Sequence, residues 1–225
     1  MRGHVANAWP ALEQIGLADW VICALKTTSM EDVVELVGPC VGPQTRILCL
    51  MNGLGVEERF AEWFGAERIF GGLAFTCINR GEPGCVHHLR YGAVTLGHLG
   101  NDPDEVAAGL ELWAGATVDF TGTDSLLRMR WEKLGWNIPF NGLGVAAAVG
   151  LPALKGEPLP GTSGPAWSTD QLLAHPEWED WVRALMDEII VVANAKSIDL
   201  DPALATTMIE RTRAMGTYRA STLID

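Results

Sequence analysis

The sequence lacks the features that define several common classes of protein. It has no long basic run and its formal net charge is −12, which argues against sequence-independent binding to nucleic acid. No apolar run approaches the roughly 20 residues that a membrane-spanning helix needs. No signal peptide opens the chain. We therefore expect a cytoplasmic protein that binds neither nucleic acid nor membrane.

Cysteine and histidine are too scattered to indicate a metal site. The five cysteines form no Cys-x-x-Cys pair and lie in apolar stretches, which is typical of buried thiols in a reducing compartment. His87 and His88 are adjacent, so in a strand they would point to opposite faces. His98 has no partner at a metal-like spacing. No metal is expected.

The first half of the chain alternates between short apolar runs and helical patterns. The runs are rich in strand formers and occupy residues 20–25, 46–51 and 68–76. Helices are expected between them at residues 31–37, with Ser29 as the cap, and at residues 56–64. This order predicts a parallel sheet with right-handed crossovers, the partial form of a Rossmann-like fold.

The pattern changes after Thr76. Residues 81–84 have turn chemistry. Short segments at residues 85–89 and 93–99, joined by a glycine-containing loop, predict an antiparallel hairpin added at the sheet edge. A helix is expected from Asp102 to about Ala114, with acidic residues suiting its N-terminal dipole.

From Asp124 onward the pattern is helical. A linker rich in Pro, Gly and Ser covers residues 151–168, and Pro139 should bend the first helix. We therefore divide the chain into an α/β domain, residues 1–121, and an all-α domain, residues 122–225. The helices of the second domain are expected at residues 124–149, 169–174, 177–195 and 202–215.

A row of polar residues interrupts the first of these helices. Lys133, Asn137 and Asn141 are spaced four residues apart, so a helix places them on one face. Buried polar groups need partners, so such a row either bonds to other protein groups or holds a ligand. The alternative is a solvated face with Lys133 at the surface.

Polar residues also follow the first two strands. Lys26 follows the first and Asn52-Gly53 the second. Ligands of open parallel sheets bind beyond the carboxyl ends of the strands. Together with the Lys133 row, these residues predict a cleft between sheet and helical domain, although singly they also suit a surface lysine and a turn.

These residues together resemble the ketopantoate reductase family from about residue 18 onward. The resemblance is carried by Ala24-Leu25-Lys26, Asn52-Gly-Leu-Gly55, Pro83-Gly-Cys-Val86 and Lys133-Leu-x-x-Asn137-x-x-x-Asn141. The resemblance implies a Rossmann domain with a helical domain, and reduction of a 2-keto acid, 2-dehydropantoate, by NADPH.

By position, the resemblance also implies roles for individual residues. Lys133 matches the general acid, and Asn137 and Asn141 match the substrate-binding amides. Asn52 matches a residue that meets nicotinamide and substrate, and Lys26 one that touches the cofactor. Residues 220–225 are similar to a family segment that contains a substrate-binding serine. Ser221 corresponds to that serine. A homodimer is also expected.

The sequence departs from the family at its glycine motif. It contains no Gly-x-Gly-x-x-Gly, the unit that cradles a pyrophosphate. We therefore expect a truncated chain, which should not bind dinucleotide tightly by itself. The alternative is a natural short protein in which another chain or a rearranged sheet covers the bare apolar edge strand. Leu151 stands about where the family offers another Asn, which leaves open a related 2-keto acid reductase or opine-type dehydrogenase. The third hypothesis is a non-enzymatic remnant that only associates with a partner or with itself.

Overall fold

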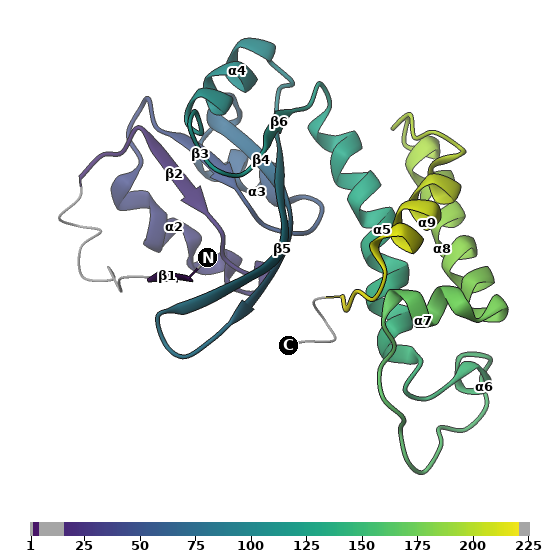
Figure 1. Cartoon of the computed structure of the whole chain (residues 1–225). Coiled ribbons are helices and arrows are strands. Elements are labelled where there is room, and N and C mark those ends of the chain that lie inside the picture. The colour runs from purple at the N-terminus through teal and green to yellow at the C-terminus, as the bar shows by residue number, and fades with distance from the viewer. Residues whose placement is uncertain (1, 5–15, 221–225) are drawn as a thin grey trace. The chain divides into compact units, whose positions relative to one another are not determined.

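The structure of the protein, a computed structural model, describes residues 2–4 and 16–220 (Figure 1). The chain forms two compact units, Met1–Leu127 and Arg128–Asp225. The first is built on one mixed sheet and the second is helical, as the sequence predicts. Among the described residues, no helix combines the length and apolar character needed to cross a membrane.

The sheet of the first unit has the strand order β1-β5-β4-β3-β2, and β6 pairs with β5. Its strands are β1 (Arg2–His4), β2 (Trp20–Cys23), β3 (Arg46–Cys49), β4 (Ile69–Arg80), β5 (Cys85–His98) and β6 (Phe120–Gly122). β2, β3 and β4 run parallel, and Cys23 lies opposite Cys49. This confirms the three parallel strands predicted from the apolar runs.

Helices cover both faces of this sheet. On one face, β2, β3 and β4 pack against α2 (Val33–Val37) and α3 (Val56–Phe64). The buried residues of this face are Cys23, Val33, Ile47, Cys49, Met51, Val56, Phe60 and Ile69. The opposite face packs against α4 (Pro103–Glu111), with Leu48, Phe70, Leu96 and Val106 buried. Coverage on both sides explains why these strands are apolar at successive positions.

The helix expected at residues 31–37 begins differently from the prediction. A 3-10 helix, η2 (Thr27–Asp32), comes first, and Ser29 lies inside it with φ −104° and ψ 20°. α2 then covers only Val33–Val37. The prediction of Ser29 as the cap was wrong, because a serine that suits a cap also suits a tight turn.

The hairpin also differs from the prediction. The segments at residues 85–89 and 93–99 belong to one strand, β5, which pairs antiparallel with β4. Tyr91 (φ 60°) and Gly92 (φ 154°) lie where the register shifts opposite Phe75 and Thr76. The glycine there forms a β-bulge rather than a loop. The chain reverses at residues 81–84 instead.

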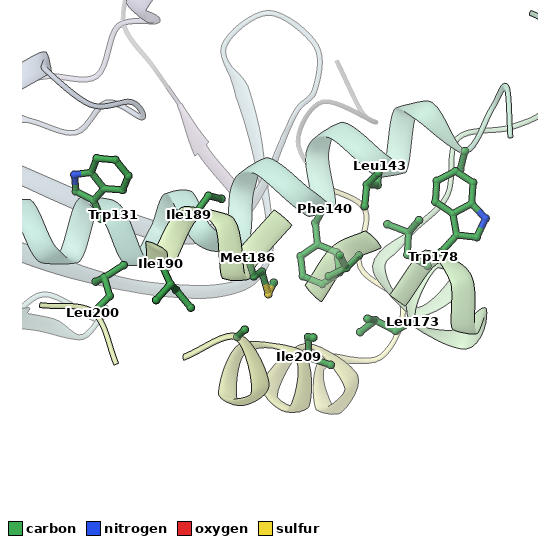
Figure 2. Close-up of a cluster of buried hydrophobic side chains, with 14 of the residues drawn as sticks. Trp131, Phe140, Leu143, Leu173, Trp178, Met186, Ile189, Ile190, Leu200 and Ile209 are labelled. Atoms are coloured by element: carbon green, nitrogen blue, oxygen red, sulfur yellow. The ribbon is translucent and has the colours of Figure 1, made fainter. Parts of the chain in front are cut away.

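The second unit packs its helices around one apolar core (Figure 2). They are α5 (Leu126–Ala146), which begins at the end of the first unit, α6 (Leu151–Leu154), α7 (Thr169–Ala174), α8 (Pro176–Ala195) and α9 (Leu204–Met215). Phe140 of α5, Met186 of α8 and Ile209 of α9 belong to this core. Leu151, at the start of the stretch expected to be a linker, is buried in the same core.

Candidate active site

Two polar side chains follow the parallel strands of the first unit at equivalent positions. Lys26 lies three residues beyond Cys23, and Asn52 lies three residues beyond Cys49. Because these cysteines are register partners in parallel strands, both polar residues leave the sheet at its carboxyl edge. Both are exposed. An ammonium and a carboxamide therefore follow neighbouring strand ends.

The loop after β3 is shaped by two glycines. Gly53 has φ 118° and Gly55 has φ 79°, conformations that side-chain-bearing residues rarely adopt. A Cβ at Gly53 would lie 3.7 Å from Thr27 Cγ2, so this loop packs against the residue that follows Lys26. Gly55 is the N-cap of α3. The glycines thus hold Asn52 beside the loop that carries Lys26.

The polar row of the second unit lies on one helix. Lys133, Asn137 and Asn141 all fall within α5 and are partly buried. The Asn141 side chain donates its Nδ2 hydrogen to the carbonyl oxygen of Asn137, at 2.9 Å. Pro139 lies between them inside the helix and has no N–H to donate. The side-chain bond therefore links two members of the row across the proline.

The Lys133 ammonium has an unusual acidity for a lysine. Burial, and next the positive charge of Arg130, lower its pKa from 10.5 to about 8. Such an amine is still mostly protonated at neutral pH, yet it gives up its proton far more readily than a solvent-exposed lysine. A group with a pKa close to the working pH is suited to general acid catalysis.

Arg130 is a charged residue of this helix that sequence reasoning missed. It lies three residues before Lys133, and only 4% of it is exposed. Residues three apart on a helix are neighbours, so two cations share this part of α5. The spacing was visible in the sequence, but nothing there showed that this arginine is buried.

The structure assigns the predicted site residues to different parts of the molecule. Lys26 and Asn52 belong to the first unit, and Lys133 with its two asparagines belongs to the second. Ser221 lies outside the described residues. The roles of these residues stay predictions. Leu151, at the position where the family has another Asn, is 8% exposed and lies in the apolar core.

The histidines of the first unit make local hydrogen bonds. His88 donates from Nε2 to the carbonyl oxygen of Tyr91. His98 is buried, with Nε2 3.1 Å from the carbonyl oxygen of Glu67 and Nδ1 accepting from the Asp102 amide. Within residues 2–4 and 16–220, no group of three His, Cys, Asp or Glu side chains is arranged to hold a metal ion.

Comparison with known families gives two matches. Residues 4–101 match the family model described as "Ketopantoate reductase PanE/ApbA". Residues 166–225 match the one described as "Ketopantoate reductase PanE/ApbA C terminal". The two matched segments come from both units of the chain and together cover more than half of it.

Individual relatives agree with these matches. The chain is 32% identical to a 2-dehydropantoate 2-reductase of Nostoc sp. (strain PCC 7120), over 97% of this chain and 65% of that protein. The crystal structure of a 2-dehydropantoate 2-reductase from Geobacter metallireducens superposes with a TM-score of 0.80 at 41% identity, over 95% of this chain and 66% of that one. The chain therefore spans just under two thirds of the length of these relatives.

A third similar structure is that of a D-mandelate dehydrogenase with NADH and anilino(oxo)acetate. It superposes with a TM-score of 0.77 at 21% identity, over 93% of this chain and 62% of that one. At this identity the likeness shows the fold alone.

Proposed function

The chain belongs to the ketopantoate reductase family, and from this membership we propose that it serves the NADPH-dependent reduction of 2-dehydropantoate to pantoate. In this proposal Lys133 is the general acid, and the reaction contributes to the synthesis of pantothenate. The observation that carries it is the partly buried ammonium of Lys133, in one helical row with two carboxamides.

The chemistry of the row suits the reduction of a ketone. When a hydride is added to the carbonyl carbon, negative charge develops on the carbonyl oxygen. An ammonium within hydrogen-bond reach of that oxygen stabilises the charge and transfers a proton to it. Asn137 and Asn141 can orient the hydroxyl and carboxylate groups of the substrate without adding charge. Ser221 is proposed as a further substrate contact.

The strand ends suit a nicotinamide dinucleotide, which would supply the hydride when bound. The ammonium of Lys26 suits the negative charge of its phosphates, and the carboxamide of Asn52 suits nicotinamide and substrate alike. Both side chains are exposed at the carboxyl edge of the sheet, and the glycines at 53 and 55 take backbone conformations that other residues rarely adopt. We propose NADPH as the cofactor on the strength of the family.

Substitution of Lys133 tests the proposal. Wild-type chain and a Lys133→Met variant are compared for loss of NADPH absorbance with 2-dehydropantoate and with other 2-keto acids. NADPH is supplied at concentrations high enough to offset the weak dinucleotide binding expected of a chain without the glycine motif. In parallel, the affinity of both proteins for pantoate is measured by tryptophan fluorescence. Without the acid we expect the rate to fall by about 10²- to 10⁴-fold, and pantoate to bind more weakly because a cation is lost.

Lys196 supplies the matched control. It is an exposed lysine at the C-cap of α8, so Lys196→Met makes the same chemical change away from the row. This variant should behave as the wild type does in both measurements. The proposal fails if Lys133→Met keeps the wild-type rate, or if the wild-type chain neither turns over 2-dehydropantoate nor binds pantoate.

We also propose that the protein forms a homodimer through α8. Three large apolar side chains of this helix face solvent: Trp181 is 36% exposed, Val191 67% and Val192 42%. Trp181 and Val192 are eleven residues apart, so they lie on the same face of the helix, and Val191 lies at the edge of that face, about 80° around the helix from Trp181. Exposed apolar groups that gather on one face mark interaction surfaces.

A further inference from the structure

Two exposed aliphatic side chains lie on either side of Asn141, the last amide of the polar row on α5. Ile138 is 41% exposed and Val145 is 49% exposed. Ile138 lies three residues before Asn141 and Val145 four residues after it, so both are its neighbours on the helix surface. The partly buried carboxamide therefore lies between two aliphatic groups.

Gly142 joins these two side chains into one apolar surface. It lies four residues after Ile138 and three before Val145, and it is exposed. A Cβ placed on it would meet no other atom of the described residues within 4 Å. Gly142 thus puts no side chain between Ile138 and Val145. We call these three residues the aliphatic strip of α5.

The aliphatic strip is separate from the part of α5 that packs into the core. Phe140 and Leu143, from the same turns of the helix, are 0% and 5% exposed and belong to the apolar core of the second unit (Figure 2). Ile138 and Val145 are exposed instead. Small-molecule sites combine an apolar surface of this kind with a few polar groups that fix the orientation of the ligand.

The polar row beside the strip suits one end of a 2-keto acid. The chain has a formal net charge of −12, so local groups rather than the overall field must attract an anion. Lys133 supplies a positive charge, and the bond from Asn141 Nδ2 to the carbonyl oxygen of Asn137, at 2.9 Å, holds the last amide in place. Helix neighbours are about 5–6 Å apart, the size of a small alkyl group. A ligand whose carboxylate and oxo groups meet the row can therefore reach the strip with its alkyl group.

We propose that the aliphatic strip binds the hydrocarbon substituent of the 2-keto acid, and that Ile138 is a specificity-determining residue that favours branched substituents over short ones. The inference rests on the proposed function, in which the row holds the polar end of the substrate. It adds the class of substrate, a 2-keto acid with a branched aliphatic group.

The experiment compares the binding of two acids to the wild type and to Ile138→Ala. 2-Hydroxyisovalerate and lactate share a carboxylate and a hydroxyl, but the first carries an isopropyl group and the second a methyl group. Their Kd values are measured by tryptophan fluorescence, to which Trp136 contributes from the position before Asn137. The wild type should prefer 2-hydroxyisovalerate by about tenfold, the effect of removing two more methyl groups from water. Ile138→Ala should reduce this preference about fivefold and leave the Kd for lactate within about twofold.

The ratio of the two Kd values does not depend on how much of a variant is folded. Both acids are measured on one sample, and a smaller folded fraction raises both apparent Kd values by the same factor. A change in the ratio therefore reports the contact with the alkyl group and not a loss of stability.

Two further variants serve as matched controls. Ile138→Val keeps a branched aliphatic group, so its preference should stay within about twofold of the wild type. Leu127→Ala removes a side chain of the same size from the same helix, where it is 44% exposed. Leu127 lies fourteen residues before Asn141, about 21 Å along the helix, so this variant should keep the wild-type preference.

The outcomes separate the inference from the proposed function. An unchanged ratio in Ile138→Ala overturns the inference, and if that variant also changes the mass in sedimentation equilibrium, the strip is a contact between copies of the chain. A wild type that binds 2-hydroxyisovalerate but not pantoate overturns the proposed substrate, and the ratio still decides the role of Ile138. A wild type that binds none of these acids overturns both.

Discussion

Lys133 is a cation in a setting that disfavours its charge. It is partly buried and shares its helix face with the buried Arg130. Burial and a like charge both raise the free energy of the protonated form. A residue that contributed only to stability would gain nothing from this arrangement. An ammonium poised to release its proton does gain from it, and perturbed acidity of this kind clusters at functional sites.

Replacing Lys133 by Met is expected to stabilise the fold at neutral pH. The pKa of Lys133 is about 8 in the folded chain and 10.5 as the reference value for the unfolded one. Between these two pH values the unfolded chain binds more protons than the folded chain does. The free energy of unfolding of the wild type therefore rises with pH through this window. Below pH 8 the lysine costs at most about 3 kcal/mol, a figure that solvent screening reduces.

The measurement is urea unfolding of wild type and Lys133→Met at pH 7 and near pH 10. The variant should have the larger free energy of unfolding at pH 7, and the difference should shrink at the higher pH. Lys196→Met, changed at an exposed position, should show no such trend. A destabilised Lys133→Met protein, or a gain that grows with pH, would contradict the assignment of a strained ammonium.

For single residues, the sequence shows how far apart side chains lie along a helix but not which of them are buried. The four-residue intervals between Lys133, Asn137 and Asn141 follow from helix geometry alone, and the structure does place all three on α5. Arg130 has an equally readable position, yet its burial depends on how the chain packs around it. The hydrogen bond from Asn141 to the Asn137 carbonyl likewise depends on the side-chain rotamer.

At the scale of elements, α4 shows how a local signal stabilises a helix. Asp102 is its N-cap, and the Oδ1 atom accepts from the amides of Asp104 at 2.9 Å and Glu105 at 3.3 Å. Pro103 occupies the first turn, where its missing N–H leaves no bond unmade. Asp102→Ala should lower the free energy of unfolding by about 1 kcal/mol, as measured by urea denaturation.

Asp102→Asn is the matched variant for this prediction. Asparagine keeps an oxygen that can accept from the same amides, so its stability should lie within a few tenths of a kcal/mol of the wild type. If Asn destabilises as much as Ala, the charge of Asp102 matters rather than the cap. If neither variant is destabilised, the hydrogen bonds contribute nothing measurable.

The sequence predicts the bounds of an element best where capping residues mark its end. α7 covers Thr169–Ala174 as expected, because Ser168 and Gln171 form a capping box at its N-terminus. β5 was not predicted as one strand, because glycine serves bulges and turns alike and only pairing with β4 distinguishes them. The 3-10 start of α2 was missed for a similar reason, since Ser29 suits either structure.

At the scale of the whole molecule, charge and apolar surface act in opposite directions on association. The chain carries a formal net charge of −12, so two copies repel each other at low ionic strength. Asp187 and Glu188 are exposed on α8 near the apolar side chains proposed to form the dimer contact. At 0.1 M salt, repulsion between exposed charges more than about 10 Å apart is largely screened. Association should therefore strengthen as salt is added.

The dimer proposal predicts that a single charge on α8 prevents association. By sedimentation equilibrium, the wild type should show twice its chain mass of 24.3 kDa, and Val191→Asp should show the chain mass itself. A buried, unpaired carboxylate at an apolar contact costs several kcal/mol, enough to dissociate a micromolar dimer. Leu159→Asp makes a comparable change at a residue that is 73% exposed outside α8, and should leave the dimer intact. A monomeric wild type, or a Val191→Asp protein that still dimerises, would rule out α8 as the contact.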